Sequence, residues 1–107
     1  KYPIAFDTED VSGDEGRADS LAATDRTDIA IAFCEKIKNA GYTPMVYSCK
    51  YFLMNCLEMS RLSSYQLWMA QYADVATYPG VYKMWQYTSS GSVRGIDRRV
   101  DLNIWFD

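Results

Sequence analysis

Two carboxylates near the start of the chain, Asp7 and Glu9, follow the short apolar run Ile4–Phe6. Such a run favours a β-strand, in which alternate side chains point to the same face. The two carboxyl groups would then lie roughly 7 Å apart along the backbone, close enough to share one small site. Two such groups do not ionise independently, so the pKa of one is pushed up. A carboxylic acid that stays protonated beside an ionised carboxylate is what acid-assisted cleavage of a sugar linkage requires.

The complete absence of histidine narrows the available chemistry. Serine and cysteine hydrolases that rely on a histidine base are excluded, and the commonest zinc ligand is missing. Hydrolysis would therefore have to use carboxylates, tyrosines or a borrowed metal. The alternative for Asp7 and Glu9 is an acidic, solvated loop after a strand, and the rest of the sequence has to decide between the two.

Charge and hydrophobicity limit the possible partners. The net charge of -3 argues against nucleic acid, and the one basic cluster, within residues 94–99, is interleaved with aspartate, as in a solvated loop. No apolar run approaches the roughly 18 residues of a membrane span. The three cysteines, Cys34, Cys49 and Cys56, are interpreted as small buried hydrophobic residues without a redox or metal role.

The hydrophobic pattern predicts strands and helices in alternation. A long helix is expected from a cap at Asp19 or Ser20 up to Gly41, with one apolar stripe toward the core. The stripe consists of Ala22, Ile29, Phe33, Ile37 and Ala40. A polar loop is expected before this helix, at 11–18, and a Gly/Ser loop near the end of the chain, at 89–95. A second helix is expected at 48–58, capped by Ser48. Strands are expected at 42–47, 65–72, 81–88 and 100–106.

This order of elements predicts an α/β fold, a partial (β/α)-barrel-like (TIM-like) structure with mostly parallel strands. Parallel barrels place their active sites at the C-terminal ends of the strands. The candidate site residues at or just beyond these ends are Asp7, Glu9, Tyr47, Tyr72 and Tyr87. The nine tyrosines in the chain serve either core packing or as flat faces for sugar rings, and position must decide between these roles.

Four motifs follow one another along the chain. They are Asp7-Thr8-Glu9 after an apolar strand, Gly41-Tyr42 to Tyr47-Ser48, Leu67-Trp68-Met69-Ala70-Gln71-Tyr72, and the closing run from Trp85 to Asn103 that ends in Val-Asp-Leu-Asn. Each motif alone is a weak signal, whereas the ordered set covers the whole chain. The set resembles the glycoside hydrolase family 25 muramidases, the Chalaropsis-type lysozymes.

The resemblance implies roles for three acidic residues. Glu9 would donate a proton to the glycosidic oxygen, and Asp7 would be its partner. Asp7 would either stabilise the oxocarbenium-like centre or orient the 2-acetamido group of the substrate for attack, and the spacing fits both routes. Asp101 matches a further acidic position that lines the site of the family; its alternative role is to hold a loop by hydrogen bonds.

Aromatic and amide side chains are the candidates for substrate binding. Tyr47 would hydrogen-bond the substrate or the catalytic aspartate, or else be a buried tyrosine with a satisfied hydroxyl. Trp68 and Tyr72 are candidate platforms for sugar rings, with burial on the helix side as the alternative for Trp68. Gln86 and Trp85 alternate faces, so at most one of them reaches the site while the other packs.

The resemblance further implies a peptidoglycan hydrolase that cleaves the β-1,4 bond between N-acetylmuramic acid and N-acetylglucosamine, with net retention and without a cofactor or metal. Its partner would be bacterial peptidoglycan, which lies outside the cytoplasm, so the parent protein would be secreted or phage-encoded. Two rival interpretations remain, a non-catalytic module that binds wall glycan and an inactive fragment.

The chain departs from the family at its front. Members carry three further strands before the D-x-E motif, together with an aspartate near the end of the first strand that helps to form the site. We therefore expect residues 1–107 to be the C-terminal half of the catalytic domain, with something removed upstream of Lys1. We also expect this half to associate with the missing N-terminal half or with itself.

Overall fold

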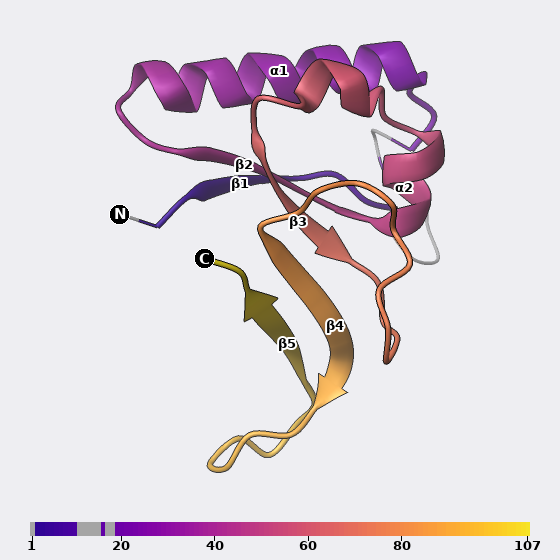
Figure 1. Cartoon of the computed structure of the whole chain (residues 1–107), viewed down its shortest axis with the longest axis vertical. Helices are drawn as coiled ribbons and strands as arrows, with labels where there is room; N and C mark the ends of the chain where they lie inside the picture. The colour runs from indigo at the N-terminus through magenta and orange to yellow at the C-terminus, as the bar shows by residue number, and fades with distance from the viewer. Residues whose placement is uncertain (1, 11–15, 17–18) are drawn as a thin grey trace.

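A curved sheet of five strands is the centre of the computed structural model, which describes residues 2–10, 16 and 19–107 (Figure 1). The strands lie side by side in chain order: β1 (Ile4–Asp7), β2 (Pro44–Cys49), β3 (Gln66–Ala70), β4 (Met84–Gly91) and β5 (Val100–Trp105). Strands β1 to β4 are parallel, and β5 is antiparallel to β4. The sheet forms a half-barrel, so the predicted partial (β/α)-barrel-like fold with mostly parallel strands is confirmed.

Helices connect the first three strands. Helix α1 (Ala23–Asn39) links β1 to β2, while α2 (Lys50–Asn55) and the short 3-10 helix η1 (Met59–Leu62) link β2 to β3. In Figure 1, α1 lies along one side of the sheet, and the connection from β3 to β4 is an irregular segment, residues 71–83. Within the described residues, no helix combines the length and the apolar character that crossing a bilayer requires.

Helix α1 starts later than predicted, and its buried face overlaps the predicted stripe only in part, since Phe33 packs against the core. Its N-cap is Ala22, which makes no side-chain capping bond, so the predicted caps Asp19 and Ser20 are wrong. Ile29, a member of the predicted stripe, is 47% exposed. Two small residues allow the helix to approach the sheet closely, and two polar ones form hydrogen bonds beneath it. The buried residues of α1 are Arg26, Thr27, Ala30 and Cys34.

The boundaries of the second helix also differ from the prediction. Gly41 does follow α1 with a φ of 90°, as expected for a glycine stop. Ser48, however, is part of β2 and not a helix cap; its hydroxyl donates a hydrogen bond to the backbone carbonyl of Thr8. The predicted helix 48–58 is divided into α2, with Cys49 at its N-cap, and η1.

Other sequence predictions are met only in part. β4 continues to Gly91, so part of the predicted loop 89–95 is strand, and the predicted loop 11–18 lies mostly outside the described residues. Cys34 is buried, and burial raises the pKa of its thiol to about 11. Cys49 and Cys56 are partly exposed, which corrects the prediction that all three are buried.

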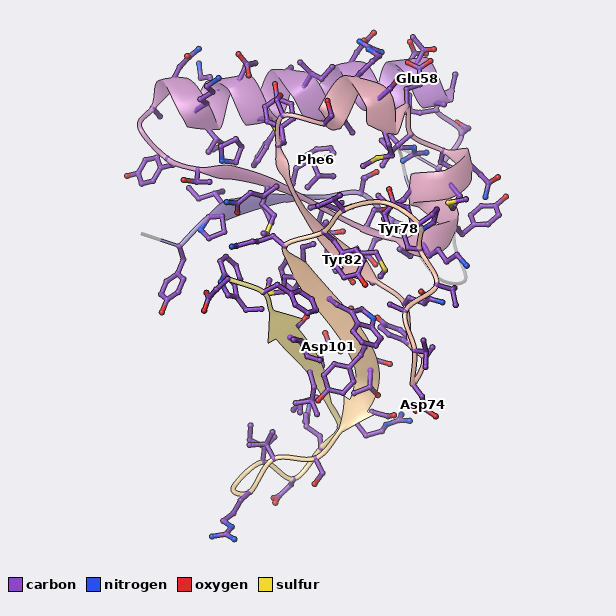
Figure 2. All side chains as sticks on the ribbon, in the orientation of Figure 1. Phe6, Glu58, Asp74, Tyr78, Tyr82 and Asp101 are labelled. Atoms are coloured by element: carbon purple, nitrogen blue, oxygen red, sulfur yellow. The ribbon has the colours of Figure 1, made fainter. Side chains whose placement is uncertain are left out.

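The hydrophobic core lies between the sheet and its helices. Val46, Leu67 and Met69 point from β2 and β3 toward Ala30 and Cys34 on α1. Figure 2 shows Phe6 beneath α1, and its ring lies 5.3 Å from that of Phe33 between centroids. Side chains of the opposite parity on each strand therefore point to the other, concave face.

The concave face carries an apolar hollow of about 300 Å³ near the N-terminal ends of the strands. β1 lies at one edge of the sheet, so its outer side has no neighbouring strand among the described residues. The hollow is lined mainly by Pro3, Ala5, Met45, Trp68, Met84 and Trp105. The lining is almost wholly apolar, so this hollow is a surface on which a further element can pack.

Candidate active site

The register of the parallel strands brings the first candidate residues into one row. Asp7 on β1 is opposite Tyr47 on β2, and Tyr47 is opposite Trp68 on β3. Residues opposite one another in a sheet point to the same face, so all three side chains belong to the concave face. The rings of Tyr47 and Trp68 meet edge to face, with centroids 4.8 Å apart.

These side chains line a hollow of about 210 Å³ at the C-terminal ends of the parallel strands. Asp101, labelled in Figure 2, reaches it from the antiparallel strand β5. Of the predicted site residues, Tyr72 and Tyr87 are absent from the lining, which includes Asp7, Glu9, Tyr47, Trp68, Gln86 and Asp101. We refer to this hollow as the carboxylate pocket.

Gln86 is the centre of the hydrogen bonds in the carboxylate pocket. Its Oε1 atom accepts hydrogen bonds from the hydroxyls of Tyr47 (2.7 Å) and Tyr72 (2.9 Å), and its Nε2 atom is 3.4 Å from Oδ2 of Asp101. Burial, followed by the influence of Tyr72 and Glu9, raises the pKa of Tyr47, so its hydroxyl stays a donor. Tyr72 is thus connected to the pocket through Gln86, and the hydroxyl of Tyr47 bonds to Gln86 and not to Asp7.

Trp68 and Trp85 lie on opposite faces of the sheet. Trp68 lines the carboxylate pocket, so the alternative of burial on the helix side is wrong; its Nε1 atom donates to Oδ1 of Asn103 at 2.8 Å. Trp85 packs against the helix-side core, and its Nε1 atom donates to the carbonyl of Gln71 at 2.9 Å. Tyr87 lies against Trp85, with ring centroids 5.8 Å apart, and does not line the pocket.

Sequence reasoning missed the side chain of Asn103 and the backbone carbonyl of Gln71 as partners of the indoles. Both residues lie inside the motifs that carry the family resemblance, but a motif does not indicate which acceptor an indole N–H will bind.

The electrostatic environment of Glu9 gives its carboxyl group a higher pKa than that of an ordinary surface glutamate. Partial burial raises the pKa of the Glu9 carboxyl, and a hydrogen bond with Asp7 and the negative charges of Asp7 and Asp101 raise it further. The neutral acid form of Glu9 therefore persists to higher pH than in an isolated glutamate. The pocket can accordingly hold a proton donor beside a second carboxyl group.

A buried polar network on the helix side fixes the backbone between the two carboxylates. Thr8, only 6% exposed, accepts a hydrogen bond at Oγ1 from Nη1 of Arg26 (2.9 Å), and its amide donates to the carbonyl of Tyr47 (3.1 Å). The Arg26 guanidinium lies 4.7 Å from the ring centroid of Phe52. Because Thr8 is held inward, Asp7 and Glu9 on either side of it are directed to the concave face.

Thr8→Val in the full-length protein is expected to lower the free energy of unfolding by about 1–3 kcal/mol, because the buried Arg26 loses an acceptor while the side-chain volume is kept. Urea denaturation followed by fluorescence measures the change. Thr43→Val is the matched control: Thr43 is exposed, and a change of roughly 0.5 kcal/mol or less is expected there. Equal stability of the two variants would show that the network contributes nothing.

A carboxylate pair at the C-terminal ends of parallel barrel strands is an arrangement that suits a glycosidase. The sequence profile of glycosyl hydrolases family 25 matches residues 1–96, and the chain belongs to this family. A D-alanyl-L-alanine endopeptidase from Streptococcus phage B30 is 36% identical over 103 residues. The match covers 83% of this chain but only 22% of that protein.

Solved structures show the same architecture. The modular autolysin LytC from Streptococcus pneumoniae superposes with a TM-score of 0.78 at 30% identity, over 98% of this chain and 26% of its own. The CTP1L endolysin gives 0.73 at 27% identity, over 98% and 35%. The spore cortex lytic enzyme SleM from Clostridium perfringens shares the fold, with a TM-score of 0.69 at 22% identity over 96% and 35%. The chain therefore spans a minor part of each of these relatives.

Proposed function

We propose that the domain to which this chain belongs hydrolyses peptidoglycan, at the β-1,4 bond between N-acetylmuramic acid and N-acetylglucosamine. The observation that carries the proposal is Glu9, whose pKa is raised beside Asp7 in a pocket at the strand ends of a family 25 glycosyl hydrolase. The names of the two relatives, an autolysin and an endolysin, support a wall polymer as substrate. They also support a protein that is phage-encoded or acts outside the cytoplasm.

In the proposed reaction, Glu9 transfers its proton to the glycosidic oxygen as the bond to the leaving sugar breaks. Asp7 stabilises the positive charge that develops at the sugar carbon, either directly or by orienting the 2-acetamido group of the substrate. Water then adds to the sugar carbon, and Glu9 recovers its proton from that water. Both routes give net retention, and the acid and the charge that they use come from Glu9 and Asp7, so no cofactor is invoked.

The remaining pocket residues have proposed roles in holding the sugar. Trp68 offers an aromatic face to a ring, and Tyr72 does the same from the rim. Gln86 and Tyr47 are fixed by their mutual hydrogen bond, so the second Nε2 donor of Gln86 and the free acceptor side of the Tyr47 hydroxyl have a defined direction. Asp101 accepts a hydrogen bond from Gln86 and adds negative charge that favours the acid form of Glu9.

We also propose that residues 1–107 are the C-terminal half of the catalytic domain. The exposed outer edge of β1 and the apolar hollow on the concave face support this division. Further strands laid against β1 would cover both.

The bond that is cleaved distinguishes the proposal from its rivals. Digestion of purified peptidoglycan by the full-length protein is expected to release new reducing ends that mass spectrometry identifies as N-acetylmuramic acid. Release of free amino groups without reducing ends would instead assign peptide-bond cleavage, which the name of the phage B30 relative describes for that protein. Glycan binding without either product would assign a binding module.

The pH dependence of activity follows from the direction of the Glu9 shift. Because the pKa of Glu9 lies above the ordinary value of 4.5, activity is expected to persist from mildly acidic toward neutral pH and to fall as pH rises through that pKa. Carbon-13 NMR of the Glu9 carboxyl measures the midpoint directly. Asp101→Asn should move it to lower pH, since one charge that raises the pKa is removed. A rate that stays flat from about pH 4 to 9 would contradict a single carboxylic acid as donor.

A further inference from the structure

A second hollow, of about 360 Å³, adjoins the carboxylate pocket and shares Glu9 and Tyr47 with it. It lies at the C-terminal ends of β2 and β3 and is closed on its outer side by the start of α2. Lys50, Tyr51 and Tyr72 contribute to its wall. A ligand bound at Glu9 would therefore extend into this second hollow, which we call the lysine pocket.

Lys50 is the only basic residue among the described residues that line either pocket. Its Nζ atom donates a hydrogen bond to Oγ1 of Thr77 at 2.6 Å. Thr77 is itself fixed by Gln71, whose Nε2 donates to the same oxygen at 2.6 Å and whose Oε1 accepts from the Thr77 amide at 2.8 Å. An ammonium group carries three donors, so the one bond to Thr77 positions the charge and leaves donors for a ligand.

Two exposed aromatic rings flank the lysine pocket. Tyr51 is 65% exposed and Tyr72 is 57% exposed, so both rings are accessible to a ligand. Their flat faces suit the apolar side of a sugar ring or the chain of a short peptide.

The charges around both pockets indicate which kind of ligand group Lys50 would bind. Four carboxyl groups line the two pockets, those of Asp7, Glu9, Asp10 and Asp101, so among the described lining residues only Lys50 attracts an anionic group. A neutral glycan would need no cation here. The muramoyl unit of peptidoglycan, in contrast, carries either a free lactyl carboxylate or a stem peptide with carboxylates of its own.

We propose that Lys50 binds a carboxylate of the muramoyl unit in the lysine pocket and so selects peptidoglycan over neutral glycans. The inference rests on the proposed function, because that function brings a muramoyl unit to Glu9. The lactyl group and the stem peptide supply the same ligand chemistry, and the experiment separates them.

The test measures binding by calorimetry, in full-length protein that carries Glu9→Gln so that no probe is cleaved. Three probes are used: the N-acetylglucosaminyl-N-acetylmuramic acid disaccharide, the same disaccharide as its lactyl methyl amide, and the disaccharide with its stem peptide. Adding Lys50→Met is expected to weaken binding of a carboxylate-bearing probe about five- to tenfold, as for a partly exposed charged hydrogen bond, and to leave the neutral methyl amide unchanged. A loss confined to the free disaccharide assigns the lactyl carboxylate, and a loss confined to the peptide-bearing probe assigns the stem.

Two control variants accompany Lys50→Met. Lys50→Arg keeps the positive charge and should retain most of the affinity, and Lys38→Met removes an exposed lysine from the last turn of α1 and should change nothing. The effect of Lys50→Met should also shrink at high salt, because the interaction is electrostatic.

An equal loss with the neutral methyl amide would overturn the proposal, because Lys50 would then only tether residues 71–83 through Thr77. Unchanged affinity for all probes, or no binding of any probe, would overturn it as well. Hydrolysis of peptidoglycan by the protein with native Glu9 is scored separately. Lys50-dependent binding without hydrolysis would contradict the proposed function but support the role of Lys50. Hydrolysis with Lys50-independent binding would support the proposed function but contradict the role of Lys50.

Discussion

Glu9→Gln in the full-length protein is expected to lower the rate of wall hydrolysis about 10²- to 10⁴-fold, the usual contribution of a general acid. Glutamine keeps the shape and hydrogen-bonding reach of glutamate but has no proton to transfer to a leaving sugar. Because Glu9 is exposed, the melting temperature should stay close to that of the native protein. Turbidity of a cell-wall suspension and a thermal melt measure the two quantities.

Asp7→Asn should cost a comparable factor, since it removes the charge that supports the reacting sugar. Asp74→Asn is the matched control, because Asp74 is an exposed carboxylate in the segment between β3 and β4, away from the carboxylate pocket (Figure 2). Activity of Glu9→Gln within a few-fold of the native protein would remove Glu9 as the acid. A similar loss in all three variants would point to overall charge instead of two specific groups.

The second large effect concerns residues 1–107 as an isolated chain, which is expected to self-associate or aggregate and to have weak or no muramidase activity. Its edge strand β1 and the apolar hollow on the concave face both lack a covering element among the described residues. Burying ~400 Å² of such apolar surface is worth about 10 kcal/mol before the costs of association. An edge strand adds unpaired backbone groups that favour pairing with another chain.

Size-exclusion chromatography with light scattering tests this expectation. Ile4→Lys places a charge on the edge strand and should shift the chain toward smaller species. Ile29→Lys is the matched control: Ile29 is 47% exposed and Ile4 36%, but Ile29 lies on α1, away from the edge. A dispersed monomer with a sharp cooperative melt would contradict self-association, and strong wall lysis by that monomer would contradict the need for further strands.

The strand order and the position of the pocket could be predicted because both follow from simple periodicities. Alternation within a strand puts Asp7 and Glu9 on one face, and it separates Gln86 from Trp85. Alternating strands and helices imply parallel pairing, and parallel pairing gathers the strand ends at one edge of the sheet. These rules need only the sequence, so the fold class and most of the pocket lining were accessible before the structure.

Polar burial could not be predicted in this way. Arg26 and Thr27 lie outside the predicted apolar stripe, yet they are 2% and 0% exposed, because Thr8, the amide of Glu58 and the ring of Phe52 surround them with partners. The role of Gln86 as an acceptor for two tyrosine hydroxyls likewise depends on residues 39 and 14 positions away. Because these hydrogen-bond partners are far apart in the sequence, a local pattern of residues does not predict that they meet.

The contact from Arg26 to Thr8 makes α1 one of the elements that position Asp7 and Glu9, the proposed catalytic pair. The helix and the backbone between the two carboxylates are joined by a buried bond, so a displacement of one is transmitted to the other. A misplacement of about 1 Å can cost a catalytic step as much as 10²-fold. Engineering aimed at stability can therefore vary the exposed side of α1 freely. A larger side chain in place of the buried Ala30 or Cys34, in contrast, would push α1 away from the sheet and displace Asp7 and Glu9.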